Sequence, residues 1–379
     1  MQYRALPKEP DTTVPILGFG CMRLPVVDRD PARIDEDRAE PLIRSAIARG
    51  VTHLDTAYPY HGGNSEPFVG RLLRGGLREQ VRIASKLPIW LVKTEADFER
   101  LLDEQLKRLE TDWLDFYMFH GLSAERWETV RRLRGLEAFE RARADGRIRR
   151  IGFSFHGSPD AFATIVDAYD WDFTQIQYNY MDEEYQAGRR GLDLAAGKGL
   201  GVIVMEPVRG GALARNVPPQ VAAVWEEAPV RRSPAEWALQ WVWNVPEVSF
   251  LLSGMSTMQH VEDDLEFADR SRPGLLTAAE LALVARVRDL YRELSPIPCT
   301  SCRYCMPCPQ GVAIPDIFEL YDDAHIYDDL PRRRMSYDMF LDEGERADQC
   351  TACGDCLDKC PQGIDIPTWM EKAQAFLAG

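Results

Sequence analysis

Four polar residues that are suited to acid–base chemistry follow short apolar runs in the first third of the chain. Asp55 ends one run, with Tyr60 five residues later, and Lys86 and His120 each end a further run. A nearby ammonium stabilises a phenolate, so Lys86 is expected to lower the pKa of Tyr60 from about 10 toward neutrality. Asp55 is expected to hold Lys86 charged and oriented. We expect Tyr60 to give a proton to a carbonyl oxygen as hydride reaches the carbon, and His120 to orient that oxygen.

These side chains need a scaffold that brings strand ends together. Apolar runs that predict eight strands cover residues 14–19, 51–54, 81–85, 116–119, 151–153, 173–177, 202–205 and 248–252. Helical spacing covers residues 37–49, 66–74, 95–109, 125–145, 158–169, 184–198, 233–244, 258–268 and 277–293. Repeated strand–helix alternation predicts a closed (β/α)₈ TIM barrel, in which catalytic groups lie at the C-terminal strand ends. A doubly wound sheet is the alternative, but no Gly-x-Gly-x-x-Gly opens a helix after an early strand.

Eight of the nine cysteines lie beyond residue 298, and Cys21 stands apart. The second of two clusters has the bacterial ferredoxin spacing C-x₂-C-x₂-C-x₃-C-P. In two-cluster ferredoxins the fourth cysteine of each run ligates the other cluster. By that rule one [4Fe–4S] cluster is held by Cys299, Cys302, Cys305 and Cys360, and the other by Cys350, Cys353, Cys356 and Cys308. The first run has one residue fewer before Cys308, so the reach of that thiol is left open.

Two Cys₄ zinc sites are the alternative for the cysteine region. Zinc ribbons usually pair two C-x₂-C knuckles across a longer gap, whereas each cluster here is packed into about ten residues and followed by proline. We therefore favour iron–sulfur clusters. The expected domains are a barrel at 1–295 and a small, mainly α-helical, ferredoxin-like domain at 296–379, with helices within 309–349.

Composition excludes several classes of function. A net charge of −15 and a pI near 5.0 argue against nucleic acid and anionic membrane surfaces as partners. No apolar run approaches the ~20 residues that cross a bilayer, and the first residues do not have the pattern of a secretory signal. We expect a cytoplasmic protein.

The residues around the four polar groups resemble a known family. Residues 55–60 (DTAYPY), Ser85-Lys86 and Phe119-His120 look like the Asp–Tyr–Lys–His tetrad of the aldo-keto reductase superfamily, and residues 17–24 are similar to its first strand. The resemblance spans about residues 14–265. It implies a TIM barrel, an NAD or NADP cofactor across the strand ends, and a small carbonyl or alcohol substrate. The string at 305–311 resembles a subgroup with a C-terminal ferredoxin-like domain.

The same resemblance implies where the cofactor is bound. Phe155 stands where the family has an Asn beside a carboxamide-binding Ser, and Met205 stands where many members stack a Tyr on nicotinamide. A thioether can still pack on a ring face. The late phosphate loop lacks the Lys often used for a 2′-phosphate, which leaves NAD and NADP both open. The implied contacts come from Ser154, Gln177, Asn179, Met205, Gly254 and Ser256.

Three functions are consistent with these patterns. The first is an NAD(P)-dependent oxidoreductase that moves hydride between cofactor and a carbonyl or alcohol. The second is a ferredoxin-type electron-transfer or docking protein on a barrel that does not turn over, and the third is a barrel epimerase or dehydratase. Hydride carries two electrons, a cluster passes one, and no flavin signature is evident. We therefore expect the clusters to serve structural support, redox sensing or docking to an electron-transfer protein.

Overall fold

The computed structural model describes residues 1–28, 30–299, 304–360 and 362–378. It divides into two compact units. The first unit consists of Met1–Gly210 and Glu236–Thr277, and the second of Gly211–Ala235 and Ala278–Gly379. Residues 211–235 and 278–295, which the sequence analysis assigned to the barrel domain, thus cluster with the C-terminal residues. The functional domain boundary at residue 295 stays a prediction.

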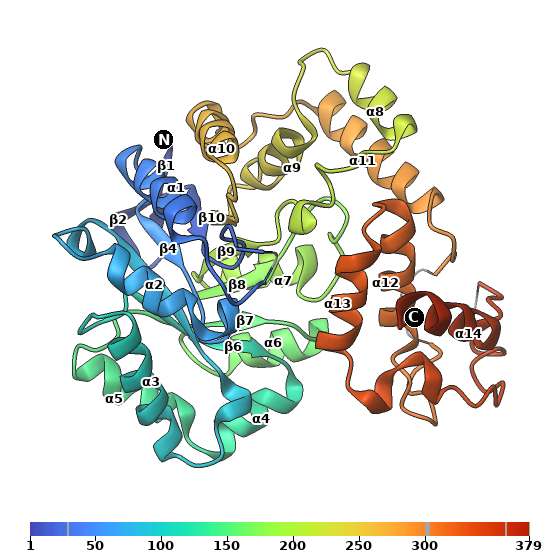
Figure 1. The fold of residues 1–379 in the computed structure, drawn as a ribbon, viewed down its shortest axis with the longest axis horizontal. Helices are drawn as coiled ribbons and strands as arrows, with labels where there is room; N and C mark the ends of the chain where they lie inside the picture. The colour runs from blue at the N-terminus through green and yellow to red at the C-terminus, as the bar shows by residue number, and fades with distance from the viewer. Residues whose placement is uncertain (29, 300–303, 361, 379) are drawn as a thin grey trace. The chain divides into compact units, whose positions relative to one another are not determined.

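The first unit is built on a closed barrel of eight parallel strands (Figure 1). Its order is β10-β3-β4-β5-β6-β7-β8-β9, which joins the last strand to the first. The strands are β3 (Leu17–Gly20), β4 (His53–Asp55), β5 (Arg82–Leu87), β6 (Phe116–Leu122), β7 (Ile151–Phe155), β8 (Phe173–Gln177), β9 (Gly201–Met205) and β10 (Val248–Ser253). The predicted barrel class is confirmed, although only the second half of the expected strand 14–19 enters the barrel.

Helices that follow the strands surround the barrel (Figure 1). They are α1 (Glu36–Ala48), α2 (Ser65–Leu72), α3 (Ala96–Arg108), α4 (Ala124–Arg132), α5 (Gly135–Ala144), α6 (Pro159–Asp167), α7 (Gly188–Gly197), α9 (Pro234–Trp243) and α10 (Met258–Arg270). The single helix expected over 125–145 is two helices. Arg134 has a φ of 55°, a left-handed conformation that no α-helix can pass through, so the chain bends between α4 and α5.

An N-terminal hairpin, which the sequence analysis did not predict, precedes the barrel. It pairs β1 (Tyr3–Leu6) with β2 (Glu9–Pro15) in antiparallel register. Leu6 and Val14 are buried in one apolar cluster with side chains from inside the barrel, namely Ala84, Phe116, Met118, Phe173, Ile203, Phe250 and Leu252. The hairpin therefore fills the N-terminal end of the barrel, opposite the strand ends where a site is expected.

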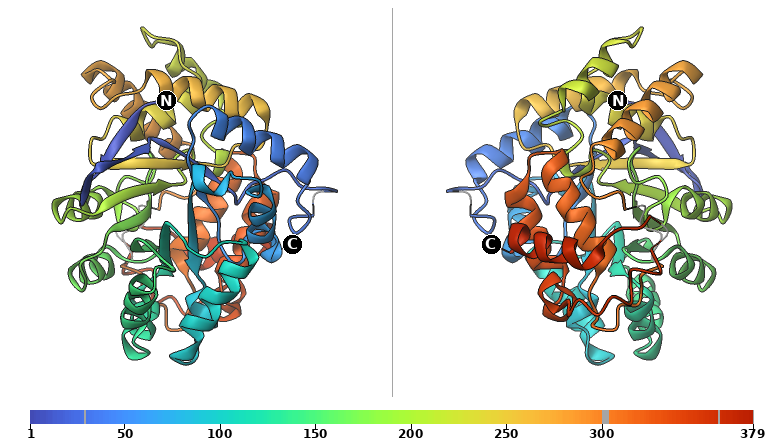
Figure 2. Two further views of the ribbon diagram at one scale, coloured as in Figure 1. Left: turned by 90° about the vertical axis from the view of Figure 1, so that its left-hand side faces the viewer. Right: turned by 90° about the vertical axis from the view of Figure 1, so that its right-hand side faces the viewer.

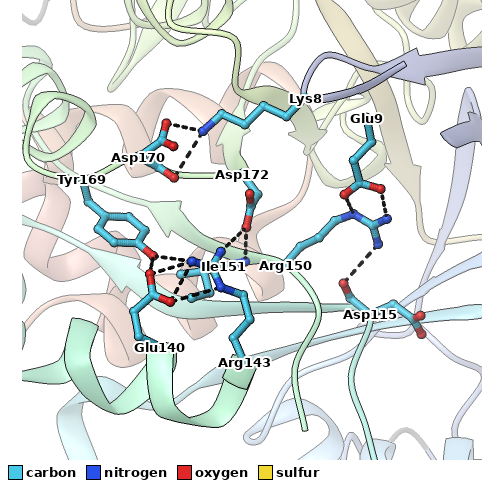
Figure 3. A network of polar contacts seen from close by, with 10 residues as sticks. All are labelled: Lys8, Glu9, Asp115, Glu140, Arg143, Arg150, Ile151, Tyr169, Asp170 and Asp172. Carbon is cyan, nitrogen blue, oxygen red and sulfur yellow. Dashed lines mark hydrogen bonds and ion pairs between the residues drawn. The ribbon is translucent and has the colours of Figure 1, made fainter. Parts of the chain in front are cut away.

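Polar contacts fix this hairpin to the loops at the same end of the barrel (Figure 3). Lys8 forms an ion pair with Asp170, and Arg150 Nε donates to Glu9 Oε1 at 2.6 Å. Beside these two contacts with the hairpin, Asp172 accepts from the backbone N–H of Ile151 at 2.8 Å and so joins the segments before β8 and at the start of β7. These contacts span long stretches of sequence, and they stabilise the closed end of the barrel without reaching the candidate site.

The second unit contains helices and no strand among the residues that the structure describes (Figure 2). Its helices are α8 (Pro219–Glu226), α11 (Ala278–Glu293), α12 (Ile314–Ile326), α13 (Leu330–Phe340) and α14 (Ile366–Leu377). Helices α12, α13 and α14 contribute to a small apolar core that includes Val312, Ile317, Phe318, Tyr337 and Met370. The expectation of helices within 309–349 is confirmed. Across the described part of the chain, no helix combines the length and apolar character needed to span a bilayer.

Candidate active site

The centre of the candidate site is a buried ion pair between neighbouring strands. Asp55 is the last residue of β4, and Lys86 is the fifth residue of β5. Lys86 Nζ donates to Asp55 Oδ1 at 2.5 Å and to the carbonyl of Thr56 at 2.9 Å. The two side chains are only 1% and 4% exposed. Burial lowers the pKa of Lys86, but Asp55 and Tyr60 raise it by more, so Lys86 stays charged at neutral pH.

Tyr60 is placed over this ion pair by a short 3₁₀ turn. The turn η1 (Tyr60–Gly63) follows β4 and bends sharply, with His61 at a φ of 53°. Lys86 Nζ lies 4.8 Å from the centre of the Tyr60 ring. Burial raises the pKa of Tyr60 above its ordinary value, and the Lys86 charge offsets only part of that rise. The expected net shift of the Tyr60 pKa toward neutrality is therefore wrong, because desolvation of the phenolate outweighs the effect of the ammonium.

His120 reaches the same site because β6 is irregular at this point. The pairing of β6 with β7 shifts register between Phe119 and Leu122, and Gly121 has a φ of 61°. The ring centres of His120 and Tyr60 are 6.2 Å apart. Burial holds the pKa of His120 well below its ordinary value, and Lys86 lowers it further. A neutral imidazole with a buried, unpartnered Nδ1 is thus available for a hydrogen bond to a bound molecule.

Two further residues support the ion pair, and neither is among the residues predicted from the sequence. Gln175 on β8 donates from Nε2 to Asp55 Oδ2 at 2.9 Å, so each oxygen of the carboxylate is engaged. Gln105 on α3 donates to the Lys86 carbonyl at 3.1 Å and to buried Glu66 at 2.5 Å. Gln175 is one of three polar residues in β8, which reads FTQIQ, so polarity alone does not single it out. Gln175 thus fixes the side chain of Asp55, and Gln105 fixes the backbone of Lys86.

The predicted amide-binding residues lie near this site with their polar groups already engaged. Ser154 on β7 accepts from the Gly121 N–H at 2.7 Å. Gln177, at the end of β8, donates to Asp182 Oδ2 at 2.8 Å. Asn179 is fully buried and contacts both the backbone and the side chain of Asp182. In this arrangement Asn179 fixes the loop after β8, and a cofactor role for these three residues stays a prediction.

The remaining predicted contacts belong to the loops after β9 and β10. Met205 ends β9 and is half-buried. Gly254 directly follows β10 and lies so close to Arg23 that a Cβ atom there would be 3.2 Å from the Arg23 side chain. Ser256 Oγ donates to the Arg23 carbonyl at 2.7 Å. Arg23, in the segment that follows β3, also pairs with Glu206 at 2.6 Å, so it contacts the loops after both β9 and β10.

The cysteines of the second unit are partly brought together. Cys308 lines one cavity with Cys350, Cys353 and Cys356. The reach of Cys308, left open by its spacing, is therefore compatible with the predicted four-thiol set. Half-buried thiols of the other set, Cys299, Cys305 and Cys360, pack against the apolar core of this unit. Cys302 lies outside the described residues, and within those residues no group of three or more His, Cys, Asp or Glu forms a single-ion site.

Comparisons with known proteins agree with this fold and site. The architecture defines a (β/α)₈ barrel with an Asp–Tyr–Lys–His site at the C-terminal strand ends. Residues 16–273 match the model of the aldo/keto reductase family, and residues 298–364 match that of the 4Fe-4S dicluster domain. The chain therefore belongs to the aldo/keto reductase family and carries a C-terminal 4Fe-4S dicluster domain. The family resemblance and the iron–sulfur prediction are confirmed at this level.

Individual relatives are distant. A probable aldo-keto reductase from Glycine max is 28% identical over 53% of this chain and 60% of its own length, and the methylglyoxal reductase YeaE of Escherichia coli is 33% identical over 36% and 47%. This chain thus spans about half to three-fifths of these curated relatives. Among solved structures, the holo form of the aldo-keto reductase AKR11C1 from Bacillus halodurans has a TM-score of 0.62 and 26% identity, covering 76% of this chain and 96% of its own. A Klebsiella pneumoniae aldo/keto reductase in complex with NADP and acetate has a TM-score of 0.61 and 25% identity, over 76% and 95%.

Proposed function

We propose that this chain is an NADP(H)- or NAD(H)-dependent reductase of small carbonyl compounds, with Tyr60 as the acid. The observation that carries this proposal is the buried Lys86–Asp55 pair at 2.5 Å, with the Tyr60 ring 4.8 Å from the ammonium. A barrel that needed only structural ion pairs would not hold a charged lysine beneath a phenol at its C-terminal mouth. The complete Asp–Tyr–Lys–His tetrad favours a catalytically active barrel over an electron-transfer or docking protein whose barrel does not turn over.

The side chains divide the work of proton transfer. Because burial raises the pKa of Tyr60, the phenol keeps its proton at neutral pH and can donate it to a carbonyl oxygen. The Lys86 ammonium then stabilises the phenolate that remains. His120, neutral because of its lowered pKa, is positioned to donate a hydrogen bond to the same oxygen. Asp55 fixes Lys86 and keeps it charged, so its contribution is made through the lysine.

A nicotinamide dinucleotide fits the residues around this site. Two features of the strand ends fit such a ligand: the buried Nδ1 of His120 has no hydrogen-bond partner among the described residues, and Gly254 has no side chain where a Cβ atom would be 3.2 Å from Arg23. Ser154, Gln177 and Met205 would contact the nicotinamide end, and Gly254 with Ser256 the phosphate end. When bound, the nicotinamide supplies hydride to the carbonyl carbon. Related structures are described with NADP or NADPH, which makes NADP(H) the first cofactor to test.

Tyr60→Phe tests the proposal, with Tyr58→Phe as a matched control. Tyr58 lies two residues away and donates to Glu104 Oε1 at 3.1 Å, away from the tetrad. With NADPH and methylglyoxal, an aldehyde chosen because a relative is named for it, Tyr60→Phe should lower kcat by about 10²–10⁴-fold. The control should retain wild-type kcat. If Tyr60→Phe keeps full turnover while binding NADPH normally, Tyr60 is not the acid.

We further propose that the second unit holds two [4Fe–4S] clusters. One would be ligated by Cys299, Cys302, Cys305 and Cys360, and the other by Cys350, Cys353, Cys356 and Cys308. The cavity shared by Cys308 and the second cysteine run supports this exchange of fourth ligands. Anaerobically purified protein should be brown, should absorb near 400 nm and should bleach with dithionite. Zinc in place of iron, with no such absorbance, would contradict the assignment.

A further inference from the structure

An arginine without an acidic partner lies beside the candidate site. Arg126 is in the first turn of α4 and is half-buried. Among the described residues its side chain makes one hydrogen bond, from Nη1 to the Gly121 carbonyl at 2.8 Å, and no described Asp or Glu is within ion-pair distance. On the same helix, exposed Arg131 pairs with Glu128 at 3.1 Å. A cation near the positive end of a helix is electrostatically unfavourable. The position therefore needs another explanation.

The irregularity that places His120 also places this guanidinium. Gly121 is left-handed, and this conformation lets its carbonyl accept from Arg126 while its N–H donates to Ser154. A Cβ atom on Gly121 would be 2.9 Å from Arg126 Nη1. Local bulges of this kind often re-aim side chains next to active sites. Arg126 is thus tied by one contact to the residue that directly follows His120.

Trp90 links Arg126 to the tetrad. It lies in the turn η3 (Ile89–Leu91) that follows β5 and is 44% exposed. Its ring centre is 5.1 Å from that of His120 and 5.5 Å from the Arg126 guanidinium carbon. An exposed indole between a cation and a neutral imidazole forms an apolar wall beside two polar groups. This is the composition of a small-molecule site, with an apolar surface and a few placed hydrogen-bond donors.

We propose that Arg126 binds a carboxylate carried by the carbonyl substrate, which makes oxo acids and other carboxylate-bearing aldehydes and ketones the preferred substrate class. The inference rests on the proposed reductase function and specifies its substrate. Nη1 of Arg126 donates to the Gly121 carbonyl. Nε and Nη2 remain available for the bidentate geometry that arginine forms with carboxylates. The strongly acidic protein would otherwise disfavour anionic substrates, so a local cation at this position has a clear use.

The test compares acids with their neutral esters. The 2-, 3- and 4-carboxybenzaldehydes and their methyl esters are assayed as matched pairs with NADPH, so that the aldehyde is constant while the charge and its position vary. Wild-type enzyme should show an acid-to-ester ratio of kcat/KM of about tenfold or more for at least one pair, as expected for a charge-assisted contact. Arg126→Gln should abolish that ratio, mainly by raising KM for the acid. Arg131→Gln, the control on the same helix, should keep both the ratio and the turnover.

The outcomes separate this inference from the proposed function. Equal use of acid and ester by wild-type enzyme, or an unchanged ratio in Arg126→Gln, overturns the carboxylate assignment while the reductase proposal stands. If neither class is turned over, the reductase proposal fails, and benzoate binding measured by calorimetry decides the role of Arg126. Loss of benzoate binding in Arg126→Gln, with binding kept in Arg131→Gln, would still support the anion site, and equal binding would refute it.

Discussion

Breaking the Lys86–Asp55 pair should cost far more stability than breaking a surface pair. Both side chains are almost fully buried, and Nζ and Oδ1 are 2.5 Å apart. In Asp55→Asn the Lys86 charge loses its counter-ion but keeps the Thr56 carbonyl at 2.9 Å and the Tyr60 ring at 4.8 Å. In Lys86→Met the Asp55 charge keeps the Gln175 amide at 2.9 Å. An uncompensated buried charge costs about 3–5 kcal/mol. Each single variant should therefore lower the free energy of unfolding by about that amount.

The double variant Asp55→Asn/Lys86→Met separates stability from chemistry. Replacing a buried ion pair by neutral groups of similar volume is often close to neutral in stability. We expect the double variant to lose less stability than either single variant, which corresponds to a coupling free energy of at least about 3 kcal/mol in the double-mutant cycle. Its reductase turnover should remain as low as that of the Lys86→Met variant, because the ammonium that stabilises the phenolate of Tyr60 is still absent.

Urea unfolding followed by tryptophan fluorescence, together with NADPH oxidation, measures both effects. Arg131→Gln is the matched control, because its partner Glu128 is at 3.1 Å and both side chains are more than 60% exposed. That variant should lose at most about 1 kcal/mol. Single variants at Asp55 and Lys86 that lose no more than the control, or a double variant that loses the sum of the singles, would refute the view of this pair as a coupled buried charge system.

Three further variants test other parts of the structure. Burial lowers the pKa of His53 to about 3, so on acidification the unfolded chain binds this proton before the folded chain does. As the pH drops from about 6.5 to about 3, the free energy of unfolding should therefore fall by about 4–5 kcal/mol more in the wild type than in His53→Leu. Urea unfolding at each pH measures this difference. Cys308→Ala should lose about half of the bound iron, while Cys21→Ala should lose none, by metal analysis. Gly121→Ala must adopt a φ of 61° and displace Arg126, so it should lose about 1 kcal/mol of stability and lower the acid-to-ester ratio.

The sequence was sufficient to predict the barrel and its charged centre because both depend on local patterns. Asp55, Lys86 and His120 each end an apolar run, and parallel strands of a barrel bring such ends to one face. Gln175 was missed for a different reason. It shares a face of β8 with Gln177, and which of the two reaches Asp55 depends on how far β8 is staggered against β7, where Gln175 pairs with Ser154. Strand stagger is a property of the closed barrel and has no local signature.

The N-terminal hairpin was missed and the pKa shift of Tyr60 was predicted in the wrong direction for one physical reason. Both depend on burial by residues that are distant in the sequence. The N-terminal hairpin has a charged, irregular second strand, and it is held by contacts such as Glu9 with Arg150, 141 residues away. The pKa of Tyr60 was expected to fall because the ammonium was considered without the desolvation of the phenol. Burial of each group depends on the whole fold, which the sequence pattern around Asp55 and Tyr60 does not contain.

The irregular step in β6 connects the chemistry of this site with its choice of substrate. One extra residue in β6 relative to β7, at His120–Gly121, leaves His120 beside Tyr60 and also turns the Gly121 carbonyl toward Arg126. A regular strand would satisfy that carbonyl in the ladder and leave the guanidinium unanchored. The imidazole that orients the reacting oxygen and the cation that we assign to the substrate carboxylate are therefore fixed by the same two residues of backbone. A substitution at His120 or Gly121 should alter both kcat and substrate preference, because a shift of this backbone moves the imidazole and the guanidinium together.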